Sequence, residues 1–347
     1  MHLKGRLQLK STYFRLQKTK DSEPILRLIT IAREKSFTVF ENKVYLGTAC
    51  ASLATMLWAG TFVIARLAVG QISPMLLAAT CWFIALLILC PCNFSVIKKE
   101  WNVVNKFLPQ IFFAALTGVA AYSPLSYFAA QTTSAINLSL ISVTSPIFIV
   151  IISSLMGQKQ PFNTWAGCFV ALLGSIYLVC NGEISRLVEL HFALGDFLMI
   201  IAAVGFAIYS LILSKIPEGL SHLTVMTLMA FFAVLLLIPC VLWEYSQGMM
   251  LFTLNTSVLF SITFMAIFSS IVAWGTWNIG LKHAGSEKAG MIYYSLPLWS
   301  GIFAFAFLDE TMGAVHLVSG ILIIGGIAWA SRTPQPAKQR EPSSSNA

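Results

Sequence analysis

Charged residues are scarce in this sequence. Asp, Glu, Lys and Arg make up 10% of its 347 residues, whereas a soluble domain is nearer a quarter charged. Hydrophobic residues make up 57%, and the mean hydropathy is +0.78. The apolar runs are about 20 residues long and do not alternate with polar residues, so they suit membrane-crossing helices rather than barrel strands. The sequence therefore predicts an all-α membrane protein with no large soluble domain.

Acidic residues are missing from the centres of these apolar runs. Of the 14 Asp and Glu residues, Asp196, Glu244 and Glu310 come closest to a centre, and each lies near a helix end. Intramembrane carboxylates are the usual proton relays. Their absence weakens a proton-coupled mechanism without excluding it, and facilitated efflux or exchange is an equal alternative.

Metal-site and catalytic patterns are absent as well. None of the seven cysteines has the spacing of a zinc site or of a secreted disulfide framework. Cys90-Pro91-Cys92 has no matching His or carboxylate cluster, so we expect no metal and no cofactor. No histidine stands beside an acid in a mid-span cluster, which disfavours a membrane-embedded enzyme.

Ten membrane spans are predicted, joined mostly by short connections. The N-terminal tail, 1–43, is basic, and it is either a short helix on the membrane surface or a partly disordered tail. The C-terminal tail, 333–347, is rich in Pro, Ser and Gln and is predicted to be disordered. The expected spans are roughly 45–68, 75–92, 109–130, 135–155, 164–180, 195–214, 222–243, 257–281, 288–307 and 313–331.

Positive charge falls on one side of this arrangement. With the N-terminus placed in the cytoplasm, 20 of the 22 Lys and Arg residues lie on that side, and only Arg66 and Arg186 lie opposite. This is the positive-inside pattern. We therefore expect both termini to be cytoplasmic, in a bacterial inner (plasma) membrane, and we ascribe the net charge of +8 to topology rather than to a nucleic-acid partner.

Two parts of the chain repeat each other. Pro146 in "LISVTSPIFIV" corresponds to Pro297 in "YYSLPLWSGIF", 151 residues later. Each repeat holds five spans, so the second enters the membrane inverted. Inverted repeats are typical of secondary transporters, whose substrate sites lie near the midplane between interrupted helices. Glycines in spans 5 and 10 favour close helix contacts, either as a scaffold for the repeats or as a homodimer contact.

Candidate substrate-binding residues are the polar side of span 4, the paired prolines, and aromatic or amide side chains near mid-depth. Aromatic walls with a few polar groups are the usual composition of a small-molecule pocket. The alternatives are interhelical packing for the hydroxyls and an interface belt for the rings. The candidates are Trp58, Thr61, Tyr122, Asn137, Ser142, Ser145, Pro146, Trp274, Asn278, Tyr293 and Pro297.

Several segments resemble the EamA family of the drug/metabolite transporter superfamily. They are "LWAGTFVIARLAVGQISPMLLAATCWFIALLIL", "GDFLMIIAAVGFAIYSLILSKIPEG" and "AWGTWNIGLKHAGSEKAGMIYYSLPLWSGIFAFAFLDE". The resemblance implies a first repeat over 44–182, a second over 195–332, a central cavity and alternating access. The sequence departs from the family pattern in four places: Met156-Gly157-Gln158, Leu308-Asp309-Glu310, and Cys81 and Ile279 where arginines are common.

The main hypothesis is a secondary transporter, acting as an exporter, for a small organic metabolite such as an amino acid. A membrane-embedded enzyme and a non-transporting sensor or scaffold are the alternatives. A sensor would need a signalling domain, and both tails are too short and too polar to supply one. The expected partners are a small-molecule substrate and the lipid bilayer.

Overall fold

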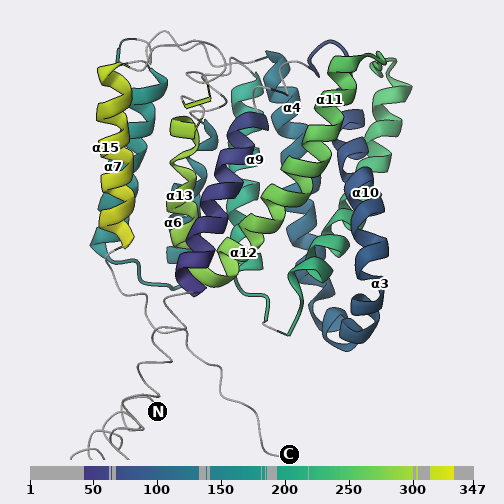
Figure 1. Cartoon of the computed structure of the whole chain (residues 1–347), viewed down its shortest axis with the longest axis horizontal. Helices are drawn as coiled ribbons and strands as arrows, with labels where there is room; N and C mark the ends of the chain where they lie inside the picture. Colours follow the sequence, from purple (N-terminus) through teal and green to yellow (C-terminus); the bar gives the residue numbers. More distant parts are fainter. Residues whose placement is uncertain are drawn as a thin grey trace, which may run out of the picture. The chain divides into compact units, whose positions relative to one another are not determined.

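The computed structural model divides into two compact units, Met1–Leu46 and Gly47–Ala347. Residues 43–46 of the first unit are described, and they are helical. The second unit is built of helices (Figure 1), which confirms the predicted all-α class. The tail predictions for 1–42 and 333–347 lie outside the described residues. The structure describes residues 43–61, 64, 68–132, 138, 141–180, 182–183, 185, 194–217, 219–299, 302–303 and 313–331.

The second unit begins with helical residues 47–61, drawn in purple in Figure 1. The elements that follow are α3 (Pro74–Ala114), η2 (Ala115–Ala120), α4 (Tyr122–Thr132), α6 (Ser145–Leu155), α7 (Phe162–Val179), α9 (Leu194–Leu213), α10 (His222–Ser246), α11 (Thr256–Phe264), η3 (Met265–Ala273), α12 (Trp274–Ala284), α13 (Ser286–Tyr293) and α15 (Ala314–Ser331).

Several of these helices have the length and composition of membrane spans. Among the described residues, Pro74–Ala129, Leu194–Leu213, His222–Ser246 and Thr256–Ala284 are long and apolar enough to cross a bilayer. Shorter apolar helices cover Ser145–Leu155, Phe162–Leu178 and Ala314–Ala330. Many large apolar side chains on these helices are exposed, such as Phe169 on α7 and Ile321 on α15, and a bilayer would cover them.

Helix α3 differs from the sequence prediction. The sequence favoured a loop near 93–108, between spans 2 and 3, but these residues are helical. The chain nevertheless reverses within this stretch, because Trp82 Nε1 lies 3.4 Å from Ser123 Oγ. A straight helix would hold these two residues about 60 Å apart. Spans 2 and 3 are therefore separate passes across the molecule, as predicted, but the segment that joins them is helical (Figure 1). Its charged residues had suggested a loop.

Two π-helical segments occur at matching places. Residues in π-helices are well under 1% of those in globular proteins, and such segments often mark functional sites. The 151-residue separation between Pro146 and Pro297 carries η2 onto residues 266–271, which lie inside η3. The backbone distortion is thus repeated with the same period as the prolines.

The first pass of α3, which runs from Pro74 to about Asn93 before the chain reverses, packs antiparallel to α10 and is joined to it at both ends. At one end the Glu244 carboxylate accepts hydrogen bonds from Ser73 Oγ at 2.6 Å, Met75 N at 3.3 Å and Leu76 N at 3.2 Å. It therefore caps the first turn of α3, where backbone donors lack partners within the helix.

The other end of this helix pair has the equivalent arrangement. Asn93 Nδ2 donates to Thr224 Oγ1 at 3.3 Å and to Thr227 Oγ1 at 3.4 Å, both in the first two turns of α10. Asn93 and Glu244 are 151 residues apart in the sequence, and so are Ser73 and Thr224. The two ends of the pair are therefore built from corresponding positions.

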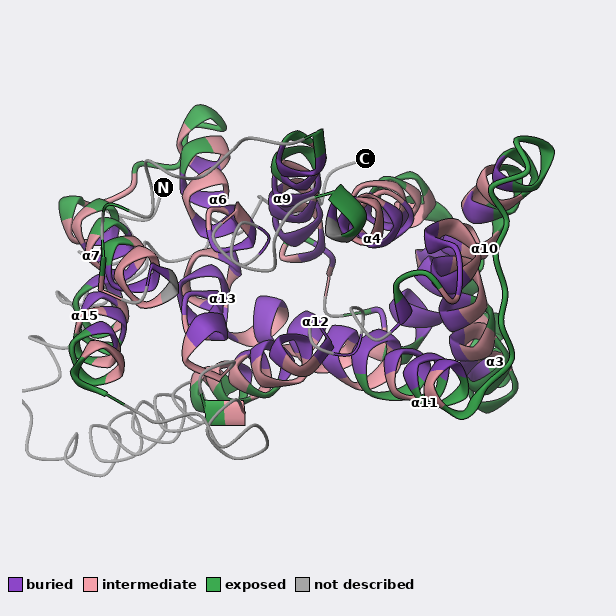
Figure 2. Ribbon diagram, turned by 90° about the horizontal axis from the view of Figure 1, so that it is seen from above, coloured by how far each residue is buried: buried purple, intermediate pink, exposed green. Residues whose placement is uncertain are grey.

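Helices α7 and α15 also run antiparallel and lie side by side (Figures 1 and 2). A Cβ added to Gly167 would lie 2.5 Å from Gly326 O, and one added to Gly174 would lie 2.7 Å from Leu322 Cβ. Glycine at these positions lets the backbones approach closely. The structure uses them within the chain, and the homodimer contact stays a prediction.

Replacing Gly326 with Ala should destabilise the fold, because the new Cβ would lie 2.6 Å from Ala171 N and 2.7 Å from Gly167 O. Backbone atoms cannot give way as a side chain can, and overpacking of this kind costs about 1–3 kcal/mol. Thermal unfolding of the protein in detergent measures the effect. Gly325→Ala is the matched control, since no atom lies within 4 Å of a Cβ there. Equal melting temperatures for the two variants would contradict the close packing.

Candidate functional site

The helix of predicted span 4 is interrupted just before Pro146. Residues 143–144 form a turn, and α6 begins at Ser145, so Pro146 occupies the first turn of a new helix. Proline is well suited to this position because its missing N–H would have no partner there. Thr144 Oγ1 donates to Ile141 O at 2.6 Å, and Ser145 Oγ donates to Ser142 O at 2.8 Å. Pro146 has no N–H to donate to Ser142 O, and the Ser145 hydroxyl bonds to that carbonyl instead. Ile141 O also accepts from Thr144 N at 3.0 Å, so the Thr144 hydroxyl adds a second bond there.

The second break repeats these bonds. Helix α13 ends at Tyr293, residues 294–295 form a turn, and Pro297 follows in helical residues 296–299. Ser295 Oγ donates to Ile292 O at 2.7 Å. Ser295 and Ile292 lie 151 residues after Thr144 and Ile141, which make the corresponding bond in the first break.

The two interrupted helices meet near their breaks. The Ser142 hydroxyl is hydrogen-bonded to Tyr293, its counterpart at the 151-residue separation. A Cβ added to Gly290 would lie 3.0 Å from Ile149 Cδ1 and 3.6 Å from Pro146 Cα, so α13 packs closely on the start of α6. The breaks that the sequence placed far apart along the chain therefore lie together.

Beside the breaks lies a cluster of eight aromatic rings, called here the aromatic cluster. Phe206 of α9 is at its centre, with its ring centroid 5.2–6.0 Å from those of six neighbours. Trp58 lies 5.4 Å from Trp274, and Trp82 lies 5.8 Å from Trp274. The members are Trp58, Trp82, Tyr122, Phe206, Tyr209, Trp274, Trp277 and Tyr293.

The polar atoms of the cluster form a short network. The hydroxyls of Tyr122 and Tyr293 lie 3.3 Å apart, and Tyr209 Oη donates to Asn278 Oδ1. Trp277 Nε1 and Asn278 Nδ2 are buried and have no hydrogen-bond partner among the described residues. Buried donors normally find a partner, so these two N–H groups are the candidate donors for acceptor atoms of a ligand.

The site combines ring faces with unpaired donors and lacks fixed charge. Every member of the aromatic cluster is uncharged, and so is each side chain given above as its hydrogen-bond partner. Such a surface can pack against an apolar or planar body and orient polar groups at its edge. It offers no nucleophile paired with a base, so binding rather than bond-making chemistry is what it can perform.

Most of the predicted site residues come together. Trp58, Tyr122, Trp274 and Tyr293 belong to the aromatic cluster, and Asn278 bonds to it. Ser142, Pro146 and Ser145 lie at the first break, and Pro297 lies at the second.

Two predicted residues are not placed in this group, Thr61 because its described hydrogen bond lies within its own helix and Asn137 because its position is not described. The Thr61 hydroxyl bonds to Leu57 O of its own helix at 3.1 Å, which matches the packing alternative for a membrane hydroxyl. Asn137 lies outside the described residues, as does Arg66.

Four members of the cluster were missed by sequence reasoning: Trp82, Phe206, Tyr209 and Trp277. Rings within long apolar runs resemble side chains that face lipid, so composition gave no reason to select them. One available signal was the repeat itself, because Tyr209 lies 151 residues after Trp58. Applying the proline separation to every predicted site residue would have found it.

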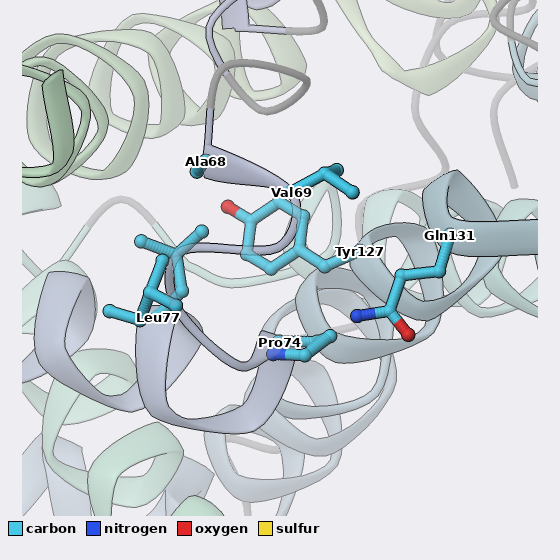
Figure 3. Close-up of a pocket in the computed structure, with 7 residues that line it drawn as sticks. Ala68, Val69, Pro74, Leu77, Tyr127 and Gln131 are labelled. Atoms are coloured by element: carbon cyan, nitrogen blue, oxygen red, sulfur yellow. The ribbon is translucent and has the colours of Figure 1, made fainter. Parts of the chain in front are cut away.

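A small pocket lies away from the rings' centre, beside the turn that precedes α3. Figure 3 shows Tyr127 and Gln131 of α4 facing Val69, Pro74 and Leu77 across it. Its cavity volume is about 10 Å³, which is room for about one water molecule. This pocket is too small for a metabolite. Within the described part of the chain, no group of three or more His, Cys, Asp or Glu residues is placed to hold a metal ion.

Comparison with known proteins gives matches over both halves of the chain. Residues 45–180 and 193–332 each match the EamA-like transporter family. An uncharacterized transporter of Archaeoglobus fulgidus is 25% identical over 284 residues, covering 80% of this chain and 94% of that protein. A protein of Streptantibioticus cattleyicolor, named "Probable terminal-alkyne amino-acid exporter", is 22% identical over 226 residues, covering 65% of this chain and 73% of its own.

One solved crystal structure has a similar fold. Its TM-score is 0.64 at 19% sequence identity, and the match covers 82% of this chain and 97% of that one. The two family matches divide the chain into duplicated halves, each containing one proline break and one π-helical segment. The family consists of transporters, which removes the membrane-embedded enzyme as an alternative. On these grounds the protein is an integral membrane transporter that belongs to the EamA-like transporter family.

Proposed function

We propose that the protein is a secondary transporter that exports a small organic metabolite, such as an amino acid or a related compound. In this proposal the substrate binds near the bilayer midplane, between the aromatic cluster and the two helix breaks. The observation that carries it is the pair of unpaired donors, Trp277 Nε1 and Asn278 Nδ2. The Trp277 ring lies against Trp58 of the first half and against Phe206 and Tyr293 of the second. Such a setting suits a compact organic molecule with acceptor groups.

The proposed architecture is ten spans in two inverted repeats, with both termini cytoplasmic. Support comes from antiparallel packing between corresponding helices, α3 with α10 and α7 with α15. The positive-inside charge pattern supports the orientation, and a bacterial inner membrane is the expected location. In repeats so arranged, rocking one bundle against another exposes a midplane site to each side in turn.

An amino acid or a related compound is favoured by two observations. The cluster and its partners carry no net charge, so a substrate with little net charge avoids an uncompensated charge in the membrane. The relative from Streptantibioticus cattleyicolor carries the name of an amino-acid exporter, at 22% identity.

Purified protein in proteoliposomes tests the function directly. Vesicles loaded with a panel of radiolabelled amino acids and related metabolites should release at least one of them faster than protein-free vesicles, with and without a pH gradient. Saturable flux of one substrate class supports the proposal, and its dependence on the gradient reports proton coupling. No flux across the panel, with no growth or toxicity phenotype on overexpression, would refute it.

Replacing either proline should impair this flux. In Pro146→Ala or Pro297→Ala, the new N–H can bond to the carbonyl four residues earlier and extend helix across the break. We expect a loss of transport with membrane insertion intact, measured as initial flux per inserted protein. Pro161→Ala is a suitable control, because Pro161 precedes α7, away from both breaks. Full transport by both Pro146→Ala and Pro297→Ala would contradict a role of the prolines in transport and leave them a role in helix packing alone.

A further inference from the structure

The interface between α6 and α13 continues from the breaks to the end where α6 terminates. From the residues just before the break to the end of α6, Ser142 meets Tyr293, Ile149 meets Gly290, and Ser153 meets Glu287. The partner numbers fall as the α6 numbers rise, so the two helices run antiparallel. From Ser145 to Ser153, α6 rises by about 12 Å. This is a little less than half of the roughly 30 Å thickness of the hydrocarbon core.

A polar network closes the far end of this interface. The Ser153 hydroxyl lies 2.9 Å from Glu287 Oε1 and 2.7 Å from Gln158 Oε1. Gln160 Nε2 donates to Ser153 Oγ at 3.0 Å and to Glu287 Oε1 at 3.2 Å. We call these four residues, Ser153, Gln158, Gln160 and Glu287, the inner latch. Charge-assisted bonds to a carboxylate are stronger than neutral ones, so Glu287 contributes most to it.

The latch joins the two family-matched halves of the chain. Ser153, Gln158 and Gln160 belong to the first half, and Glu287 stands in the first turn of α13 in the second. In the orientation proposed above, both segments face the cytoplasm. The corresponding residues at the opposite face lie mostly within 133–137 and 304–312, outside the described residues.

We infer that the inner latch holds the cytoplasmic gate of the transporter shut, and that its hydrogen bonds to Glu287 break whenever the site opens to the cytoplasm. Below the aromatic cluster, the tight contact of Gly290 on Ile149 forms the seal. Glu287 then sets the equilibrium between closed and open gate without contacting substrate. The inference rests on alternating access as the proposed mechanism.

The test uses a reporter cysteine inside the seal. Ala207 of α9 is fully buried in one apolar cluster with Ile149. Ala207→Cys leaves Ile149 in place and should react slowly with a membrane-impermeant maleimide added to the cytoplasmic face of inverted vesicles. Adding Glu287→Ala or Ser153→Ala should raise the labelling rate about tenfold, equivalent to ~1.4 kcal/mol in the gate equilibrium. Labelling of the chain without the reporter is subtracted, because Cys50, Cys90, Cys92 and Cys240 are not fully buried.

Ser154→Ala is the matched control, since among the described residues the Ser154 hydroxyl bonds to Val150 O of its own helix and not to the latch. It should leave the labelling rate unchanged. Glu287→Gln keeps the size and an acceptor oxygen but loses the charge, so it should give an intermediate rate and guards against a folding defect in Glu287→Ala. Equal rates in the Glu287, Ser153 and Ser154 variants would overturn the latch. Because labelling needs no substrate, a failure to find flux counts against the proposed function alone.

Discussion

Backbone groups in a hydrocarbon layer must find hydrogen-bond partners within the protein, and this constraint determines how the helices can be broken. A break exposes carbonyls that lose their helix donors. In both halves a hydroxyl two positions before the proline, that of Thr144 or Ser295, adds a bond to a turn carbonyl that also accepts a backbone N–H. In the first half the Ser145 hydroxyl also bonds to Ser142 O, which lacks the N–H that Pro146 cannot supply. The interruption is therefore stable, and it directs the helix ends and their tyrosine and serine side chains toward the aromatic cluster.

Corresponding residues of the two halves also join the helix ends. The Glu244 carboxylate caps α3, and the Asn93 amide occupies the equivalent place beside α10. A carboxylate at a helix N-terminus interacts favourably with the free N–H groups there. These contacts tie the first pass of α3 to α10 at both ends. The α6 and α13 pair is likewise joined at two places, by Ser142 and Tyr293 at the breaks and by the latch around Glu287 at the far end.

The all-α class, the duplication and several residues of the aromatic cluster and the helix breaks could be predicted from the sequence. Pro146 and Pro297 are detectable because proline is unusual in the middle of an apolar run. Trp58, Tyr122 and Trp274 are detectable because amphipathic rings near mid-depth are unlike an interface belt. Phe206 was missed because an apolar ring is equally at home against lipid. The helical connection after span 2 was missed because charged residues suggest a loop, although its apolar side chains, such as Val104, are buried against the core.

Inversion of the two halves is the central claim, and side-specific labelling tests it most directly. Phe162 and Gly313 occupy corresponding positions 151 residues apart, just at or before the starts of α7 and α15, and both are exposed. Single cysteines introduced at the two positions should react with an impermeant maleimide from opposite faces of the membrane, position 162 from the cytoplasm and position 313 from outside. Reaction of both from the same face would contradict the inverted arrangement and the transport mechanism built on it.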